Sequence, residues 1–239
     1  MSAAKLLVMF VALALLPVAA AEQSSQQRDG NLFRWDGGQW VQVEGYGTRV
    51  SVGPDGSPWV VNSRNEIFRL VNGGFQRLPG TAKDIGVGAD GTAWIIGTDN
   101  GIYRWNHGSW ELMPGKGIAI SVDRSGAPWV VNGSDEIFHW RTDGFVLQDG
   151  RARDIGAESG VWIIGTDNRV YRREGNSWSQ LDGSGERISA GADGTAWVVN
   201  RAGEIYRWEN GSFRRVPGAA TDIGVNASGQ AWIVGSPRS

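Results

Sequence analysis

One tryptophan recurs along the chain at an almost constant interval, and this repeat limits the fold more than any other feature. It stands at positions 59, 94, 129, 162, 197 and 232, so that successive steps are 35, 35, 33, 35 and 35 residues. The short step falls in the fourth repeat, where AESGV replaces VGADGTA at a turn. An aromatic residue keeps the same phase at Phe33, Phe68, Tyr103, Phe138, Tyr171 and Tyr206. Six copies of one unit predict a closed ring of repeats or a solenoid.

Each repeat has the pattern of four short β-strands, which we name a, b, c and d in chain order. In one repeat the segments RVSVG, PWVVN, EIFRLV and GFQRLP are separated by PDG, SRN and NGG, which supply the residues of tight turns. Small sheets with two apolar faces need neighbours on both sides, and radial packing provides them. The predicted fold is all-β, a six-bladed β-propeller of four-stranded antiparallel blades.

The two ends of the chain carry complementary halves of one repeat. Residues 31–45, NLFRWDGGQWVQVEG, match strands c and d, and residues 221–235, TDIGVNASGQAWIVG, match strands a and b. We therefore expect the last blade to join N-terminal strands c and d to C-terminal strands a and b. The predicted propeller spans residues 31–239, after a short N-terminal segment at 22–30.

Residues 1–21 have the pattern of a secretory signal peptide. One positive charge at Lys5 precedes an apolar run from Leu6 to Val18, which is short for a bilayer span, and Ala19–Ala21 supply the small residues of a cleavage site. We expect a secreted or extracellular protein; the alternative for this segment is an uncleaved anchor. Because the chain has no cysteine, core packing has to hold the exported fold without disulfides.

The charge balance excludes two classes of partner. The formal net charge is -2 at pH 7, from 23 basic and 25 acidic residues. Nucleic acid or an anionic membrane would call for a basic face or stripe. The sequence therefore predicts no nucleic-acid binding and no membrane insertion.

The unit DIGVGADGTAWIIGTDNGIYRWNHGSWELMPG, residues 84–115, resembles the tectonin repeat. The resemblance covers residues 31–235, and its motif recurs six times. It implies a six-bladed propeller, commonly a secreted carbohydrate-binding protein, or lectin, with several sites and a role in innate defence or cell-surface recognition. Some proteins with this repeat are instead intracellular protein-interaction or membrane-trafficking components, and the expected export signal argues against that role.

The repeats alternate between two kinds, so the true unit is a pair of about 70 residues that occurs three times. Even repeats read DIG followed by WIIG or WIVG, whereas odd repeats read RVS, AIS or RIS followed by WVVN. A pseudo-threefold ring follows from this alternation. We expect it to present about three pseudo-equivalent ligand sites, each between neighbouring blades.

Polar residues at strand ends are the candidates for these sites. The end of strand b and the start of strand a point to one rim, and an Asn at the first is followed 22 residues later by an Asp at the second. The loops between b and c add further Asp and Asn residues, together with Glu66, Glu136 and Glu204. The candidate ligand-binding residues are Asn62, Asp84, Asp99, Asn100, Asn132, Asp154, Asp167, Asn168, Asn200 and Asp222. Carboxylates and amides suit sugar hydroxyls, and no cofactor is implied, although the same oxygens are also ligands for Ca²⁺.

The same polar residues have a structural interpretation. One position of strand a carries Arg49, Asp84, Ala119, Asp154, Arg187 and Asp222. This alternation favours a ring of ion pairs between blades, broken at Ala119. The Asn residues at the ends of strand b are equally suited to capping turns.

The aromatic residues divide in the same way. The strand b Trp occurs in every repeat and is predicted to be core. The strand d position alternates Trp and Phe, which favours filling the gaps between blades. The strand c position varies, so its members are candidates for exposed surfaces that stack on a sugar ring or form an oligomer contact: Trp35, Trp105, Trp140 and Trp208.

No enzyme motif is present. The chain has no cysteine nucleophile and no GxSxG turn, and its two histidines, His107 and His139, are not spaced as metal ligands. Repeated equal sites suit multivalent binding instead. The predicted function is recognition of cell-surface glycans by a lectin, and the alternative is a protein-recognition propeller without sugar binding. The sequence does not set the oligomeric state.

Overall fold

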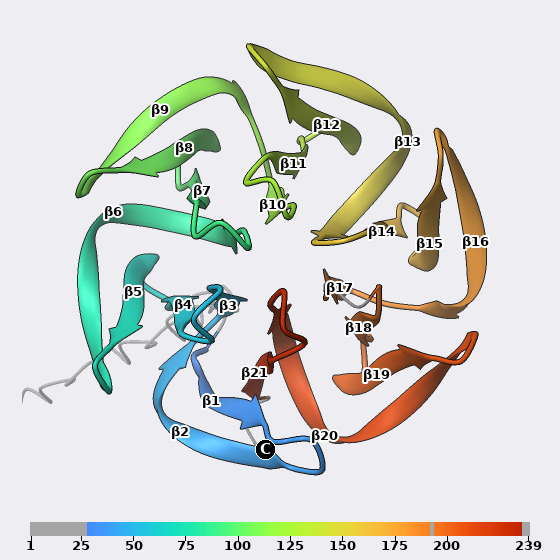
Figure 1. Cartoon of the computed structure of the whole chain (residues 1–239), viewed down its shortest axis with the longest axis horizontal. Coiled ribbons are helices and arrows are strands. Elements are labelled where there is room, and N and C mark those ends of the chain that lie inside the picture. The colour runs from blue at the N-terminus through green and yellow to red at the C-terminus, as the bar shows by residue number, and fades with distance from the viewer. Residues whose placement is uncertain (1–27, 192–193, 236–239) are drawn as a thin grey trace, which may run out of the picture.

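The computed structural model describes residues 28–191 and 194–235, and every regular element within them is a β-strand. The strands surround a central axis, and the first strand of each repeat lies innermost (Figure 1). The predicted signal peptide at 1–21 lies outside the described residues, as does most of the predicted segment at 22–30.

The strands are hydrogen-bonded in three sheets of seven strands each. The first sheet contains β3 (Arg49–Val52), β4 (Pro58–Val61), β5 (Glu66–Val71), β6 (Gly74–Val87), β7 (Ala93–Gly97), β8 (Gly101–Asn106) and β9 (Ser109–Lys116). The second contains β10 (Ala119–Val122), β11 (Pro128–Val131), β12 (Glu136–Arg141), β13 (Gly144–Ala157), β14 (Val161–Gly165), β15 (Arg169–Glu174) and β16 (Ser177–Ser184). The third contains β17 (Arg187–Ala190), β18 (Ala196–Val199), β19 (Glu204–Glu209), β20 (Ser212–Val225), β21 (Ala231–Gly235), β1 (Gly30–Trp35) and β2 (Trp40–Gly47).

Each sheet consists of two four-stranded antiparallel ladders that share one long strand. The first part of β6 pairs with β5 as far as Thr81, and the remainder pairs with β7 from Ala82 onward. The long strands β13 and β20 behave in the same way. We number the ladders 1 to 6 in chain order, beginning with β3–β6 and ending with β20, β21, β1 and β2. The predicted meanders are confirmed, but the expectation of six separate blades is corrected, because the ladders are joined in pairs.

One residue position differs between the two kinds of junction. Within a sheet, buried Ala82, Ala152 and Ala220 stand where the strand passes from one ladder to the next. Between sheets that position is Gly47, Gly117 or Gly185. A Cβ on Gly117 would lie 2.6 Å from the side chain of Ile96 and 2.7 Å from that of Val130, so a larger residue there would crowd both side chains. Strand β9 ends at Lys116, just before this glycine, and β10 begins at Ala119.

The N-terminal strands close the ring, as the sequence predicts. Strand β1 pairs antiparallel with β21, with Leu32 opposite Val234 and Arg34 opposite Trp232. Ladder 6 is therefore assembled from both ends of the described chain. No covalent bond is needed at this seam.

The core consists of six apolar clusters, one at each junction between neighbouring ladders. All six strand b tryptophans are at most 4% exposed, which confirms them as core residues. Trp162, for example, packs with Ile164 and Val170 of its own ladder and with Ile188 and Val198 of the next. Each ladder is thus held by its neighbours as much as by its own strands.

Replacing Trp162 by alanine tests this packing. The side chain is fully buried, so Trp162→Ala should lower the free energy of unfolding by about 3–5 kcal/mol through lost burial and an unfilled cavity. Leu112→Ala is the matched control, because Leu112 is 64% exposed and its removal should change stability by less than about 0.5 kcal/mol. Urea unfolding followed by tryptophan fluorescence measures both, and equal effects would contradict the assignment of the core.

Candidate functional site

The loops between strands b and c lie at one rim of the ring, which we call the loop rim. It comprises residues 62–65, 98–100, 132–135, 166–168 and 200–203. The sequence places its ligand-binding candidates at this rim and at the adjoining starts of strand a. The structure separates these candidates into three groups.

The first group, Asn62, Asn132 and Asn200, holds the loops of the odd ladders together. Asn62 Oδ1 accepts the N–H groups of Arg64 and Glu66 at 3.0 and 2.9 Å, and its Nδ2 donates to Glu66 Oε2 at 2.7 Å. Asn132 and Asn200 make the same three bonds in their own loops. These amides cap turns.

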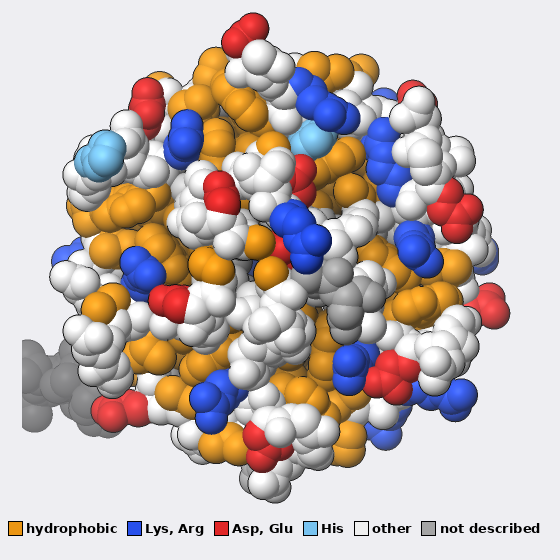
Figure 2. All heavy atoms as spheres, viewed as in Figure 1, with side chains coloured by type: hydrophobic (Ala, Val, Ile, Leu, Met, Phe, Trp, Pro, Cys, Tyr) orange, Lys and Arg blue, Asp and Glu red, His pale blue; other side chains and the backbone are white. Residues whose placement is uncertain are grey.

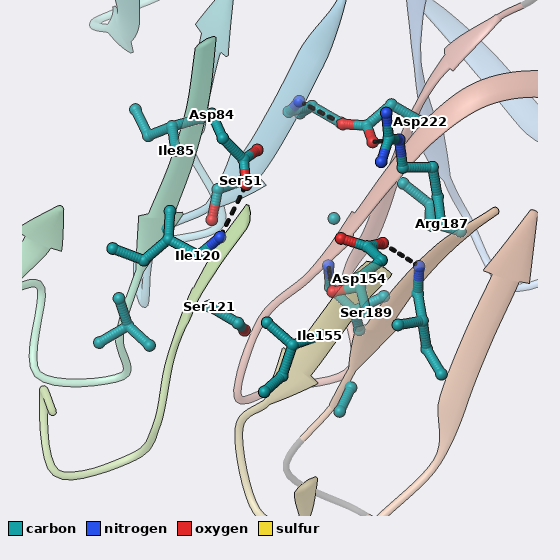
Figure 3. A pocket seen from close by; sticks show the side chains of 18 of the residues that line it. Ser51, Asp84, Ile85, Ile120, Ser121, Asp154, Ile155, Arg187, Ser189 and Asp222 are labelled. Atoms are coloured by element: carbon teal, nitrogen blue, oxygen red, sulfur yellow. Dashed lines mark hydrogen bonds and ion pairs between the residues drawn. The ribbon is translucent and has the colours of Figure 1, made fainter. Parts of the chain in front are cut away.

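The second group, Asp84, Asp154 and Asp222, lies at the axis and joins one sheet to the next (Figure 3). Asp154 and Asp222 are buried, and the side chain of Asp84 is 15% exposed. Asp84 Oδ2 accepts the backbone N–H of Ile120 at 2.8 Å. Asp154 accepts from Ile188, and Asp222 accepts from Val50, at the same distance. Each Asn bonds the Glu four residues on, and each Asp bonds the following sheet, so the structure gives the two members of each predicted Asn-Asp pair separate hydrogen-bond partners.

Serines complete this ring of contacts within the sheets. Ser51 Oγ accepts the N–H of Val87, Ser121 that of Ala157, and Ser189 that of Val225, each at 3.0 Å. Asp and Ser bonds alternate around the axis and connect all six innermost strand segments. Gly86, Gly156 and Gly224 lie between them, where a Cβ would meet the neighbouring backbone at 2.6–3.3 Å.

The predicted ion pairs between neighbouring strands a are confirmed at two of three places. Arg49 Nε lies 3.8 Å from Asp84 Oδ1, and Arg187 Nε lies 3.6 Å from Asp222 Oδ1. Asp154 faces Ala119 instead. Burial raises the pKa of Asp154 to about 7 and that of Asp222 to about 6, and it also raises the pKa of Asp84.

The third group, Asp99, Asn100, Asp167 and Asn168, stays at the exposed loop rim. The side chains of Asp99 and Asp167 are 54% and 47% exposed. Asp167 Oδ2 accepts the hydroxyl of Tyr171 at 2.8 Å, which lowers the pKa of Asp167, and Asp99 is bonded in the same way by Tyr103 at 3.0 Å. Asn100 and Asn168 accept from Lys83 and Arg153. These four residues remain open to a ligand.

The strand c tryptophans do not form free stacking surfaces. Each packs against the strand b Trp of the preceding ladder: Trp35 on Trp197, Trp105 on Trp59, Trp140 on Trp94 and Trp208 on Trp162, with ring centroids 5.6–6.4 Å apart. Even Arg173, which replaces Trp in ladder 4, lies over Trp129 at 5.0 Å. The residues at this position therefore share one packing role although their types differ, because a guanidinium can cover an indole ring as another aromatic ring does.

Three grooves between neighbouring ladders combine a carboxylate with at least two aromatic rings. The groove between ladders 3 and 4, of about 320 Å³, has Asp167, Tyr171 and Trp178. Two related grooves lie between ladders 4 and 5 and between ladders 6 and 1, with volumes of about 300 and 350 Å³. Their corresponding residues are Asp182, Tyr206 and Phe213 in one, and Glu44, Phe68 and Phe75 in the other.

The sequence interpretation missed most residues of these grooves. Of the residues that line them, Asp167 and Asn200 are among its ligand-binding candidates. The acidic residue lies in the outer strand at positions 44 and 182, and Pro114 takes the same place in the third pair. The acidic residue that is present in two of the three pairs at this repeat position is the sequence signal for two of the grooves.

Charge and metal-binding geometry limit what the described surface can do. Acidic and basic side chains are interspersed, with apolar surface between them, on the face shown in Figure 2. Within residues 28–191 and 194–235, no three His, Asp or Glu side chains are grouped as a metal site, and no helix is long and apolar enough to cross a membrane.

Comparison with known proteins adds sequence relatives and fold neighbours. The Tectonin domain family model matches residues 18–94, 81–159 and 151–239. Tectonin-2 of Physarum polycephalum is 50% identical over 40 residues, which are 17% of this chain and 11% of that protein. Tectonin-1 of the same organism is 46% identical over 41 residues, 17% of this chain and 19% of that protein. The matches thus span less than a fifth of either relative.

Solved structures with a similar fold are much more distant in sequence. The WD40 β-propeller domain of Doa1 has a TM-score of 0.62 at 14% identity, over 87% of this chain and 84% of that one. The structure of U3-55K has a TM-score of 0.59 at 11% identity, over 82% and 75%. These likenesses show the β-propeller fold.

The buried aspartates make stability depend on pH. A carboxyl whose pKa is raised in the folded state contributes stability at low pH that is lost as the pH rises through its folded value. For Asp154 the change from 3.8 to about 7 corresponds to at most about 4 kcal/mol, lost between about pH 4 and pH 7. Asp154→Asn keeps an acceptor for the Ile188 N–H and has no charge to bury. The free energy of unfolding of Asp154→Asn, relative to that of the wild type, should therefore increase between about pH 4 and pH 7.

Urea unfolding at pH 4.5, 6 and 8 measures this difference. Asp167→Asn is the control, because the exposed Asp167 has a lowered pKa and its replacement should not produce a relative gain with pH. Parallel pH profiles for the wild type and Asp154→Asn would contradict the raised pKa of Asp154.

Proposed function

Because the chain belongs to the tectonin family, we propose that it is a carbohydrate-binding protein that recognises cell-surface glycans multivalently. We regard each four-stranded ladder as one blade of a six-bladed propeller whose blades are joined in pairs. The pattern of residues 1–21 supports secretion, which would bring the protein to such glycans.

The observation that carries this proposal is the shared composition of the three grooves. A carboxylate can accept hydrogen bonds from sugar hydroxyls, while an aromatic ring covers the apolar face of a pyranose. Trp178 Nε1 donates to Asp149 O at 2.8 Å, so the indole of the groove between ladders 3 and 4 is held in place before any ligand arrives. A fixed ring of this kind binds at a lower cost in entropy.

The three grooves are not all equivalent, whereas the sequence predicts about three pseudo-equivalent sites. Two lie between sheets and are related by the pseudo-threefold axis, whereas the third lies within the second sheet. We propose that several weak sites together give useful affinity for a surface with many copies of one sugar. No residue is assigned a catalytic role.

A second candidate function, protein recognition, is favoured by exposed apolar side chains. Leu112, Val146 and Leu147 are 49–64% exposed on the outer strands of ladders 2 and 3. The position of the two leucines is Gln42, Arg77, Gln180 or Arg215 in the other ladders. A protein that contacts these side chains would bind without competition from sugars.

A glycan array probed with the full chain, with and without EDTA, tests the main proposal. We expect selective binding to one class of sugar. Asp167→Asn, Asp182→Asn and Glu44→Gln should each weaken it, and the triple variant should weaken it by more than any single change, because avidity is lost. Loss of signal in EDTA would assign a Ca²⁺ requirement to the acidic residues of the rim or grooves.

Asp55→Asn is the matched control. Asp55 has a 50% exposed side chain, but it lies in the turn between strands a and b at the opposite rim, so its replacement should leave binding unchanged. If folded protein gives a blank array, the carbohydrate proposal fails. A protein partner sensitive to Leu112→Asp would then support the second candidate.

A further inference from the structure

A small polar cavity lies on the axis of the ring and is lined by all six innermost strand segments (Figure 3). Its volume is about 50 Å³, which is room for roughly three to five water molecules. Four carboxylates line it: Asp84, Asp154, Asp222 and Glu158. The cavity is separate from the three grooves.

The ion pairs around this cavity are incomplete at one place. Arg49 and Arg187 come from β3 and β17 and approach Asp84 and Asp222 of the same sheets. The corresponding residue of β10 is Ala119, so Asp154 receives no guanidinium from its own sheet. Arg49 and Arg187 both lower the pKa of Asp84 and that of Asp222, whereas the main cation that lowers the pKa of Asp154 is Arg187, which comes from the next sheet.

Glu158 provides a second, independent indication that positive charge is lacking. The residue is 6% exposed, and its Oε1 has no hydrogen-bond partner among the described residues. Arg124 favours its ionised form, whereas Asp123 and Asp90 oppose it. When all are ionised, the four carboxylates of the cavity outnumber by one charge the three arginines that lower their pKa values, Arg49, Arg187 and Arg124. Buried carboxylates of this kind require a cation or a proton.

We propose that the axial cavity binds a small organic cation, whose guanidinium or primary ammonium group pairs with Asp154 where the other two repeats place arginine. A guanidinium has four heavy atoms, which suits the volume, and its N–H groups can donate to Asp154 and to the serine hydroxyls of the ring. The described residues offer no grouping for a metal ion, which favours a cation that carries hydrogen-bond donors.

Titration of the full chain with methylguanidinium tests the proposal. Calorimetry at pH 8, where Asp154 is ionised, should give saturable binding with one site per chain, and the melting temperature should rise with methylguanidinium concentration. Tetramethylammonium carries the same type of charge without N–H donors and serves as the control ligand. Equal effects of the two cations would overturn the proposal, because they would report screening alone.

Two variants locate the site. Ala119→Arg should supply the missing guanidinium and weaken methylguanidinium binding by about tenfold or more, because Asp154 would then already be paired with a charged hydrogen-bond donor. Asp154→Asn keeps an acceptor for the Ile188 N–H but removes the charge that the cation pairs with, so saturable binding should be lost. Unchanged affinity in folded Ala119→Arg, or undiminished binding to Asp154→Asn, would overturn the assignment; the second variant decides if the first does not fold.

Discussion

The structure depends on a closed ring of hydrogen bonds in which side chains of the innermost strand segments bind the backbone of their neighbours. Ser51, Ser121 and Ser189 join the two ladders of each sheet, and Asp84, Asp154 and Asp222 join each sheet to the next. These bonds hold the innermost strand segments close together, and Gly86, Gly156 and Gly224 stand where a Cβ would meet the neighbouring backbone. The apolar clusters lie between neighbouring ladders, so their packing depends on the same spacing.

This ring explains why the binding surface differs from the one that the residue pattern suggests. A buried carboxylate that accepts a backbone N–H is committed to the fold, because releasing it would leave two polar groups unpaired. The Asn residues at the loop rim are committed in the same way to their own turns. Apart from the axial cavity, the groups left open to a ligand therefore lie further from the axis, in the grooves and on the exposed loops of the even ladders.

Differences between the repeats mark the places where function is expected. Asp182 and Glu44 contribute carboxylates to two related grooves, whereas Pro114 removes that group from the third position. Ala119 interrupts the axial ion pairs, and the shortened turn of the fourth repeat contains Glu158. Each substitution leaves the neighbouring strands in place. The scaffold is thus nearly threefold, while the chemistry that it presents is not.

The sequence by itself determined the all-β class, the strands of each repeat and the closure of the ring, because these follow from short-range alternation, turn residues and a constant period. It also predicted the two axial ion pairs and the buried tryptophans. The joining of ladders in pairs, the packing of Trp35, Trp105, Trp140 and Trp208, and the composition of the grooves were decided only by the tertiary structure. The physical reason is that a polar or aromatic side chain can contact a ligand only if no backbone N–H or aromatic ring of the adjacent ladder already lies against it. That neighbour is some 35 residues away in sequence, and its distance is set by the axial ring.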